Sequence, residues 1–448
     1  MKKILSMLLV LTMLFSLAAC GGTAEESEAP APVQSEETAP AEEEAPAAET
    51  EADTAGGEKT VLKISNYAIL ESNYTAFWEG VEAGFEEAYP EYDIEWVTSE
   101  YSQTTTNVLT AAGAGDYCDA IFGEHSWIST LAYAFEPATS VLNEEVIGEF
   151  DSTILDSCVF DGECYAVPYY VSPFILYYNT QLFEEAGITE VPTTFEELEA
   201  ACEKLAGLKS PITGNAVVPF GQTTASVAIS GTSLTAFIYN FGGDVMTPEG
   251  KMSVDNDGFT QAMTTLKNLY DKGYMTENQK LKDLRQSYAN GELAMYYDQA
   301  WGFSGVSGIN PDAASFTASA PAMSGGSGTG QSVLNAAVFM VSNKNGNADG
   351  VNKFISYVTS DEELGYYLSD IAAAWSAKTS QADMEVQAVL AGATGSQSNL
   401  KAVPMIETLN DLNLELCTLA QNITLNGMSV DDGIAAFKNS TVYQTIGE

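Results

Sequence analysis

Apolar and polar positions follow two alternating periods along the chain after residue 60. Residues 61–65 and 92–97 repeat apolar side chains at every second position, which predicts strands. Residues 77–89 repeat them at every fourth position, which predicts an amphipathic helix. A helical stretch over 108–112 and a short apolar strand over 119–123 follow. This order of strands and helices is typical of a sheet with crossover helices, and it predicts an α/β fold.

The same alternation continues through the rest of the chain. A long apolar strand is predicted over 174–178, and Thr194 to Glu197 forms a capping box that starts a helix. A second capping box begins at Ser360, and the pattern predicts further helices over 259–270, 283–290, 349–357 and 429–438. From residue 60 the chain has about 390 residues, which is too long for one core, so we expect two lobes.

The first nineteen residues have the pattern of a targeting segment. Lys2 and Lys3 precede an apolar run over 4–17 that is short for a membrane span. The run ends in Leu17-Ala18-Ala19-Cys20, which matches the lipobox of bacterial lipoproteins. We therefore expect a signal peptide over 1–19 and a lipid-modified Cys20. Two acyl chains on that cysteine would give stable membrane anchoring.

Residues 20–59 form an acidic tether in this interpretation. After Cys20 the segment consists almost wholly of Ala, Glu, Pro, Ser, Thr and Gly, with twelve carboxylates against Lys59. It has no aromatic residue, so it cannot bury enough apolar surface to offset the entropy of ordering. We expect it to be disordered and to hold the body away from the membrane.

Charge and residue usage exclude several classes of function. Of the formal charge of −45, the leader contributes +2 and the tether −11, which leaves −36 on residues 60–448. Such an acidic body excludes nucleic acid as a partner, because phosphate binding needs clustered Lys and Arg. The ligand classes that remain compatible with an acidic body are neutral polar molecules such as sugars and cations such as polyamines. His125 is the only histidine, so we expect no metal site and no cofactor.

The cysteines give no metal motif, and one pairing stays open. Cys158 and Cys164 flank Asp161-Gly162, which predicts a hairpin turn. With a two-residue loop, Cys158 would lie opposite Tyr165 rather than Cys164, so a disulfide would need a bulge or a longer loop.

Several motifs resemble one known family in order and spacing. They are FEEAYP at 85–90, AGAGD at 112–116, DGECYAVPY at 161–169, LYYN at 176–179, LFEEAG at 182–187, PTTFEEL at 192–198 and GELAM at 291–295 with Trp301 downstream. Together they resemble the family 1 extracellular solute-binding proteins, the maltose-binding-protein-like substrate receptors of ABC sugar importers. The resemblance covers essentially the whole body.

The resemblance implies two α/β lobes, each a mostly parallel sheet flanked by helices, joined by three hinge crossings. We expect the first lobe to comprise 60–170 and 331–375, and the second 171–330 and 376–448. The ligand would lie in the cleft between the lobes, where closure removes a polar molecule from water. In open α/β sheets, ligands bind beyond the carboxyl ends of the strands.

Candidate ligand contacts therefore come from the loops that follow strands. Trp301 is the principal candidate, because an indole offers a flat apolar face and an N–H donor to a sugar ring, and the family counterpart stacks on sugar. Trp127 and Trp375 are secondary aromatic candidates. The remaining candidates are Tyr67, Glu71, Tyr101, Glu124, His125, Tyr169, Ser172, Gln222 and Asp298.

We interpret the sequence as a non-enzymatic carbohydrate receptor, held by its lipid on the outer face of the cell membrane as in Gram-positive bacteria. Its expected partners are a sugar and the membrane permease of an ABC importer, and we expect a monomer. A polyamine or other cationic ligand is the first alternative, because the body is acidic. A surface glycosidase with two carboxylates is the second. No catalytic motif favours the enzyme.

Overall fold

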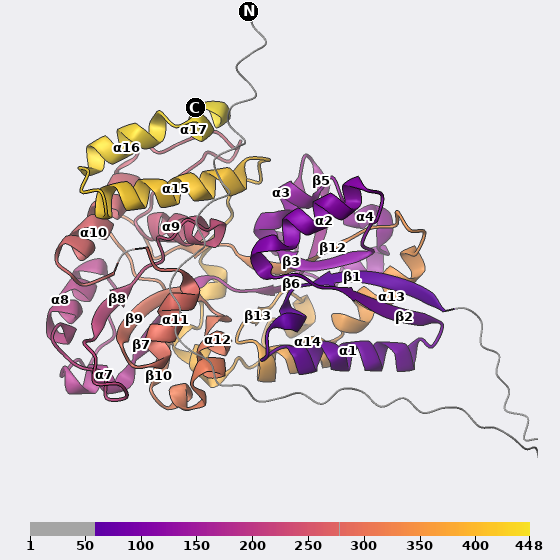
Figure 1. Cartoon of the computed structure of the whole chain (residues 1–448), viewed down its shortest axis with the longest axis horizontal. Coiled ribbons are helices and arrows are strands. Elements are labelled where there is room, and N and C mark those ends of the chain that lie inside the picture. The colour runs from indigo at the N-terminus through magenta and orange to yellow at the C-terminus, as the bar shows by residue number, and fades with distance from the viewer. Residues whose placement is uncertain (1–58, 277) are drawn as a thin grey trace, which may run out of the picture. The chain divides into compact units, whose positions relative to one another are not determined.

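Two β-sheets organise the residues that the computed structural model describes, 59–276 and 278–448 (Figure 1). The predicted signal peptide, Cys20 and the tether up to residue 58 lie outside the described residues.

The first sheet has six strands in the order β13-β6-β12-β3-β1-β2. Their bounds are β1 Thr60–Asn66, β2 Tyr92–Val97, β3 Ala120–Glu124, β6 Ala166–Val171, β12 Ala336–Val341 and β13 Trp375–Ser376. Strand β1 is parallel to β2 and β3, whereas β12 is antiparallel to both β3 and β6. The sheet is therefore built from an N-terminal parallel part and strands that run against it.

The second sheet has four strands in the order β10-β7-β9-β8, and a separate two-stranded ribbon pairs β11 with β14. The bounds are β7 Phe174–Asn179, β8 Val218–Gly221, β9 Leu293–Gln299, β10 Thr317–Ala320, β11 Ser332–Val333 and β14 Leu400–Lys401. Only β8 and β9 are parallel within this sheet; β7 is antiparallel to β9 and β10. The predicted α/β class is confirmed, but the expectation of mostly parallel sheets is wrong, because the strands next to the crossings run in the opposite direction.

Alternating side chains bury both faces of the first sheet. Phe122 and Phe339 point to one face, and their neighbours Ile121 and Val338 point to the other. Figure 1 shows α1 and α14 along one face and α2 and α3 along the other. The helices around this sheet are α1 Thr75–Ala88, α2 Thr104–Gly113, α3 Ile128–Leu131, α4 Ala138–Val141, α5 Glu144–Ile147, α6 Ser152–Asp156, α13 Ala348–Val358 and α14 Asp361–Tyr366.

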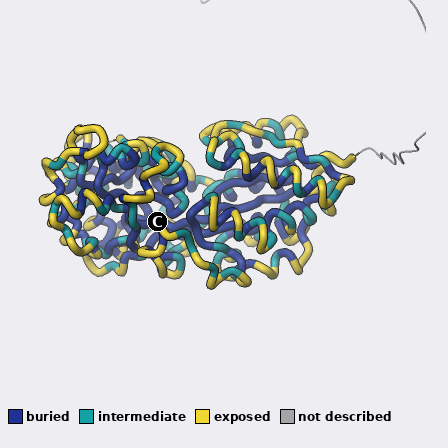
Figure 2. Tube along the Cα trace, turned by 90° about the horizontal axis from the view of Figure 1, so that it is seen from below, coloured by how far each residue is buried: buried dark blue, intermediate teal, exposed yellow. Residues whose placement is uncertain are grey.

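The second sheet is enclosed in the same way. Leu176 and Met295 face one core, and Tyr177 and Tyr296 face the other. The tube in Figure 2 shows buried segments in the interior and exposed turns around them. The helices are α7 Thr180–Glu185, α8 Phe195–Leu205, α9 Ala228–Asn240, α10 Asp257–Asp271, α11 Leu281–Ala289, α12 Gly302–Ile309, α15 Leu409–Thr424, α16 Val430–Lys438 and α17 Thr441–Ile446.

Local sequence signals behave as predicted. Thr194 and Glu197 form the capping box of α8, and Ser360 accepts from the Glu363 backbone N–H at the start of α14. Asp161 and Gly162 both have positive φ, at 51° and 82°, as a two-residue hairpin turn requires.

The hairpin of β4 (Val159–Phe160) and β5 (Glu163–Cys164) keeps the two-residue loop, and the Tyr165 N–H donates to the Cys158 carbonyl. Cys158 and Cys164 are both free thiols.

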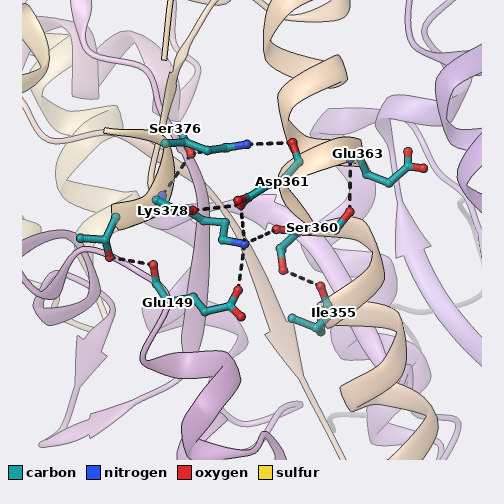
Figure 3. Close-up of polar contacts among 11 residues, drawn as sticks. Glu149, Ile355, Ser360, Asp361, Glu363, Ser376 and Lys378 are labelled. Atoms are coloured by element: carbon teal, nitrogen blue, oxygen red, sulfur yellow. Dashed lines mark hydrogen bonds and ion pairs between the residues drawn. The ribbon is translucent and has the colours of Figure 1, made fainter. Parts of the chain in front are cut away.

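The chain passes between the sheets after β6, before β12 and after β13. Directly after β13, Lys378 is fixed against the first sheet's helices (Figure 3). Its Nζ donates to the Thr359 carbonyl at 2.9 Å and lies 2.8 Å from Glu149 and 3.0 Å from Asp361. The Lys378 side chain is only 6% exposed, so these three acceptors replace the water that its charge would otherwise bind. The segment directly after β13 is thereby tied to the first lobe.

Within the described part of the chain, no helix combines the length and the apolar character that crossing a membrane requires.

Candidate functional site

Aromatic rings from three loops meet at the carboxyl ends of β1, β2 and β3. Tyr67 follows β1, Tyr101 begins the short helix η2 (Tyr101–Gln103), and Trp127 ends η3 (His125–Trp127). The ring centroids lie 5.1 Å apart for Tyr67 and Tyr101, 5.6 Å for Tyr67 and Trp127, and 5.3 Å for Tyr101 and Trp127. Parallel strands bring their carboxyl ends to one edge, which explains why these residues meet.

Gly123 makes room for this aromatic cluster. A Cβ at Gly123 would lie 2.8 Å from the Trp127 ring, which is closer than side-chain carbons approach. The ring of Trp127 therefore lies directly on the backbone of β3.

Glu124 is the last residue of β3 and lies beside the aromatic cluster. It is 5% exposed, and its Oε2 has no hydrogen-bond partner among the described residues. Burial raises the pKa of this carboxyl to about 7, although the nearby Tyr101 hydroxyl, Arg285 guanidinium and Gln299 amide favour its ionised form. A carboxyl group in this setting binds a proton or a hydrogen-bond donor readily.

The second lobe contributes a buried ion pair. Arg285 on α11 donates from Nε and Nη2 to the two carboxylate oxygens of Asp298, at 2.7 and 2.8 Å. The Asp298 side chain is fully buried, and the Arg285 side chain is 12% exposed. This bidentate geometry holds the planar guanidinium in one orientation.

Two glycines of α12 create the space for this pair. A Cβ at Gly302 would lie 2.2 Å from the Asp298 carboxylate, and a Cβ at Gly305 would lie 3.1 Å from Cδ of Arg285. The two positions are one helical turn apart, so they lie on one face of α12. The helix therefore packs directly on the ion pair.

Trp301 stands at the start of α12, against Arg285. The guanidinium carbon of Arg285 lies 4.3 Å from the centroid of the indole ring, within cation–π range. The backbone N–H of Trp301 donates to Ser172 Oγ at 3.1 Å, which ties the residue to the first crossing. The Trp301 ring is partly exposed and packs against the hydrophobic core of the first sheet, as Tyr101 and Trp127 do.

Other contacts join the two lobes around this point. Ser304 on α12 donates to the Ile371 carbonyl of the first lobe at 2.9 Å. The half-buried Glu71 lies within the electrostatic reach of Arg285 and Lys282, although burial raises the pKa of its carboxyl on balance. The second lobe thus places positive charge opposite two carboxyl groups of the first.

Three polar atoms without a hydrogen-bond partner lie at strand ends in this part of the molecule. They are Asn66 Nδ2, Glu124 Oε2 and Gln299 Nε2, out of fourteen such buried side-chain atoms among the described residues. Asn66 ends β1, Glu124 ends β3 and Gln299 ends β9. Buried polar atoms are normally paired, so a set of donors and acceptors at the ends of three strands is a property of binding sites.

Comparison with known proteins identifies the family. Residues 67–364 match the family model of the bacterial extracellular solute-binding proteins, which is more than half of the chain. The chain belongs to this family. The expectation from the sequence motifs is thereby confirmed.

Curated relatives of this solute-binding protein are distant. A binding protein from Brucella abortus is 23% identical over 255 residues, which cover 54% of this chain and 58% of the relative. The mannitol-binding protein of Pseudomonas aeruginosa is 28% identical over 121 residues, covering 24% of this chain and 26% of the relative. The matches thus span little more than half the length of these relatives, or less.

Solved structures share the fold over most of the chain. An ABC transporter solute-binding protein from Thermotoga lettingae, bound with α-D-tagatose, has a TM-score of 0.76 at 20% identity and covers 87% of this chain and 100% of its own. The GacH receptor of Streptomyces glaucescens has a TM-score of 0.75 at 19% identity, covering 87% and 98%. These similarities confirm the two-lobed fold of the solute-binding protein.

Half of the predicted contacts lie together. The structure brings Tyr67, Tyr101, Trp127 and Glu124 to one edge of the first sheet, with Glu71 close by, and Trp301 of the second lobe packs against the same hydrophobic core.

Four predicted contacts lie elsewhere or have another role. Asp298 is not open to a ligand, because both of its oxygens accept from Arg285. Tyr169 lies in the core with its ring against Phe339, at 5.3 Å. Trp375 is buried in the core cluster beside the second sheet. Gln222 donates to Ser233 and Thr223 within the second lobe.

Ser172 and His125 are structural in the described residues. Ser172 accepts from the Trp301 backbone, so it positions that residue. His125 Nε2 lies 2.6 Å from the Ser157 carbonyl, and burial lowers the pKa of the imidazole. His125 also lines a cavity of about 20 Å³ with Asn335 and Asn413, which has room for about one water molecule.

Arg285, Gln299 and Tyr170 were not among the contacts predicted from the sequence. Tyr170, the neighbour of Tyr169 on β6, lies within the electrostatic reach of Glu124. A signal for Arg285 was present: it is the only arginine among the 17 basic residues of the chain. Arginine forms bidentate and stacked contacts that lysine cannot form, so a single arginine among lysines is a candidate for a special position.

Proposed function

We propose that this protein is the substrate-binding lipoprotein of a bacterial ABC importer and that it closes around an uncharged carbohydrate without changing it chemically. The observation that carries the proposal is the pair of aromatic surfaces, Tyr67, Tyr101 and Trp127 in one lobe and Trp301 in the other. Sugar rings present C–H faces that stack on aromatic rings and hydroxyl edges that bond to polar groups. The unpaired atoms of Asn66, Glu124 and Gln299 supply such polar groups.

The names of relatives support a carbohydrate ligand. Besides the mannitol-binding protein, a maltotriose-binding protein from Pyrococcus abyssi and a diacetylchitobiose-binding protein from Streptomyces coelicolor match parts of the chain. Their ligands differ in size and linkage but are all rich in hydroxyl groups.

The charges at the site favour a neutral ligand over a polyamine. A cationic ligand would use the electron-rich face of an aromatic ring, but Arg285 already occupies one face of Trp301. Asp298 is neutralised by the same arginine. A second cation next to Arg285 would be repelled, whereas a neutral sugar would not.

The same ion pair argues against a surface glycosidase. Hydrolysis needs two carboxyl groups on opposite sides of the glycosidic bond. Among the described carboxyls around Trp301, Asp298 is bound to Arg285, and Glu71 and Glu124 both come from the first lobe. We therefore propose a receptor that is not an enzyme.

The expected attachment and partners complete the proposal. Cys20 would carry the lipid, residues 20–59 would span the distance to the body, and the permease of the importer would receive the closed form. The lobe division, 60–170 with 331–375 and 171–330 with 376–448, is part of this proposal.

A thermal-shift screen with maltotriose, mannitol, tagatose, acarbose, diacetylchitobiose and spermidine tests the ligand class. A ligand that binds only the folded state raises the melting temperature. We expect one or more of the sugars to do so and spermidine to have no effect. Calorimetric titration of the sugar at low and high salt should give the same affinity, because a neutral ligand is not screened. Stabilisation by spermidine alone, or breakdown of the sugar during incubation, would contradict the proposal.

A further inference from the structure

Glu124 occupies an unusual position for a carboxyl group. It ends β3, where Ala337 at the start of β12 pairs with it directly after the second crossing. Residues of the second lobe, Arg285 and Gln299, approach its side chain from across the interface. Groups of both lobes therefore surround its side chain in this arrangement.

The ionised form of Glu124 is poorly compensated in this arrangement. The nearest positive charge, on Arg285, directs Nε and Nη2 to Asp298. Oε2 of Glu124 has no hydrogen-bond partner in the described part of the chain. A buried carboxylate with an unpaired oxygen is costly, and the usual outcome is that the group takes up a proton.

The groups around Glu124 do not remove this cost. Tyr101 and Gln299 offer donors and Arg285 offers positive charge, but burial outweighs all three and raises the pKa of the carboxyl to about 7. The negative charge of Glu71 raises the pKa of the Glu124 carboxyl further, as burial does. The remaining titratable groups that interact with Glu124 are the hydroxyls of Tyr67 and Tyr170.

We propose that closure of the two lobes transfers a proton from solvent to Glu124, so that ligand binding by this protein is coupled to proton uptake. The bond formed is the O–H of a neutral carboxylic acid, and the proton comes from water or buffer. When the lobes separate, the carboxyl group faces water and loses the proton. The coupling of proton uptake to ligand binding rests on the proposed function. The coupling of proton uptake to lobe closure does not.

The direction of the pH effect follows from the two states. The closed state has the raised pKa, near 7, and the open state has the ordinary value of a glutamate. The added stability of the closed state is therefore present at low pH and is lost as the pH rises through about 7. Over the range from about pH 6 to about pH 8, the preference of the ligand-free protein for the closed state should fall about tenfold. Above that range it should level off.

Small-angle scattering of the ligand-free protein tests closure directly. We expect the parent to have a smaller radius of gyration at about pH 5.5 than at about pH 8. In Glu124→Gln, which resembles the protonated acid in shape and charge, the radius should be the same at both values. Glu100→Gln is the matched control, because Glu100 is an exposed carboxylate of the same sheet edge and should leave the parental response unchanged.

Calorimetry measures the proton itself. Titration of the sugar identified by thermal shift, in two buffers of different ionisation enthalpy at about pH 7, should show uptake of about half a proton by the parent and none by Glu124→Gln. A radius that is independent of pH, or that responds equally in Glu124→Gln, overturns the inference. So does a response that is lost in Glu71→Gln but kept in Glu124→Gln. Failure of every sugar to bind would contradict the proposed function. Scattering of the ligand-free protein would still show whether closure depends on the protonation of Glu124.

Discussion

The guanidinium carbon of Arg285 lies 4.3 Å from the centroid of the Trp301 ring, while the same side chain donates two hydrogen bonds to Asp298. One face of the indole is thus covered by a group that cannot move without breaking a buried ion pair. A ligand can stack only on the remaining surface of the ring. Arg285 therefore sets both the orientation of Trp301 and the side from which it is approached.

Replacing Trp301 by Ala should weaken sugar binding by about 2 kcal/mol or more, which is about thirtyfold in the dissociation constant. The physical reason is the loss of a large stacking face at the centre of the site. Calorimetric titration of Trp301→Ala and Trp301→Phe against the parent measures the effect, with Trp301→Phe expected between the two. If Trp301→Ala folds normally and binds within about twofold of the parent, Trp301 is not a ligand contact.

Replacing Arg285 by Met should destabilise the second lobe by about 3–5 kcal/mol, because Asp298 would remain buried without its partner. The double variant Arg285→Met with Asp298→Asn should recover part of this loss, since the uncompensated charge is gone. Denaturant unfolding measures both variants. Equal stability of the single and double variants would mean that the pair is not coupled.

Replacing Lys378 by Met should lower the free energy of unfolding by about 1–2 kcal/mol. The methionine keeps most of the packing but leaves the Thr359 carbonyl without its donor, while Glu149 and Asp361 are exposed enough to regain water. Thermal unfolding checks this, with Lys209→Met, at an exposed lysine, as the control. No difference between the two variants would show that the contacts of Lys378 are not needed for stability.

Replacing Cys20 by Ala should release the protein from the membrane fraction of a Gram-positive host. The expectation follows from the lipobox, since a diacylated cysteine would be the anchor. Cell fractionation followed by immunoblotting measures the distribution, and Cys118→Ala serves as a control because that thiol is buried in the body. A Cys20→Ala variant as firmly bound as the parent would place the anchor elsewhere.

The spacing of apolar residues, together with the residues that cap helices and form turns, was enough to predict much of the fold. Helix α1, the capping box of Thr194 and the turn at Asp161 depend on interactions within a few residues, so the sequence contains their signals. The meeting of Tyr67, Tyr101 and Trp127 also followed, because parallel strands align their carboxyl ends.

The direction of each strand, and the face of the sheet to which each strand residue points, could not be predicted from the sequence in the same way. Every residue of β6 is buried, so no alternation distinguishes Tyr169 from Tyr170: both belong to the core, and Tyr170 also lies near Glu124. The Arg285 and Asp298 pair joins α11 to β9 and depends on the glycines of α12. Such a contact is decided by how elements pack, and hydrophobic periodicity does not encode it.

The single arginine gives the chain a built-in reporter. Because no second arginine exists anywhere in the 448 residues, an arginine-selective reagent such as phenylglyoxal can modify this protein at one side chain only. That side chain is held between Asp298 and Trp301, so its rate of modification measures how often the lobes part and α11 loosens. Likewise, a protease that cleaves only after arginine can cut the native sequence at one peptide bond, between Arg285 and Gln286, and its rate reports local unfolding of the same helix.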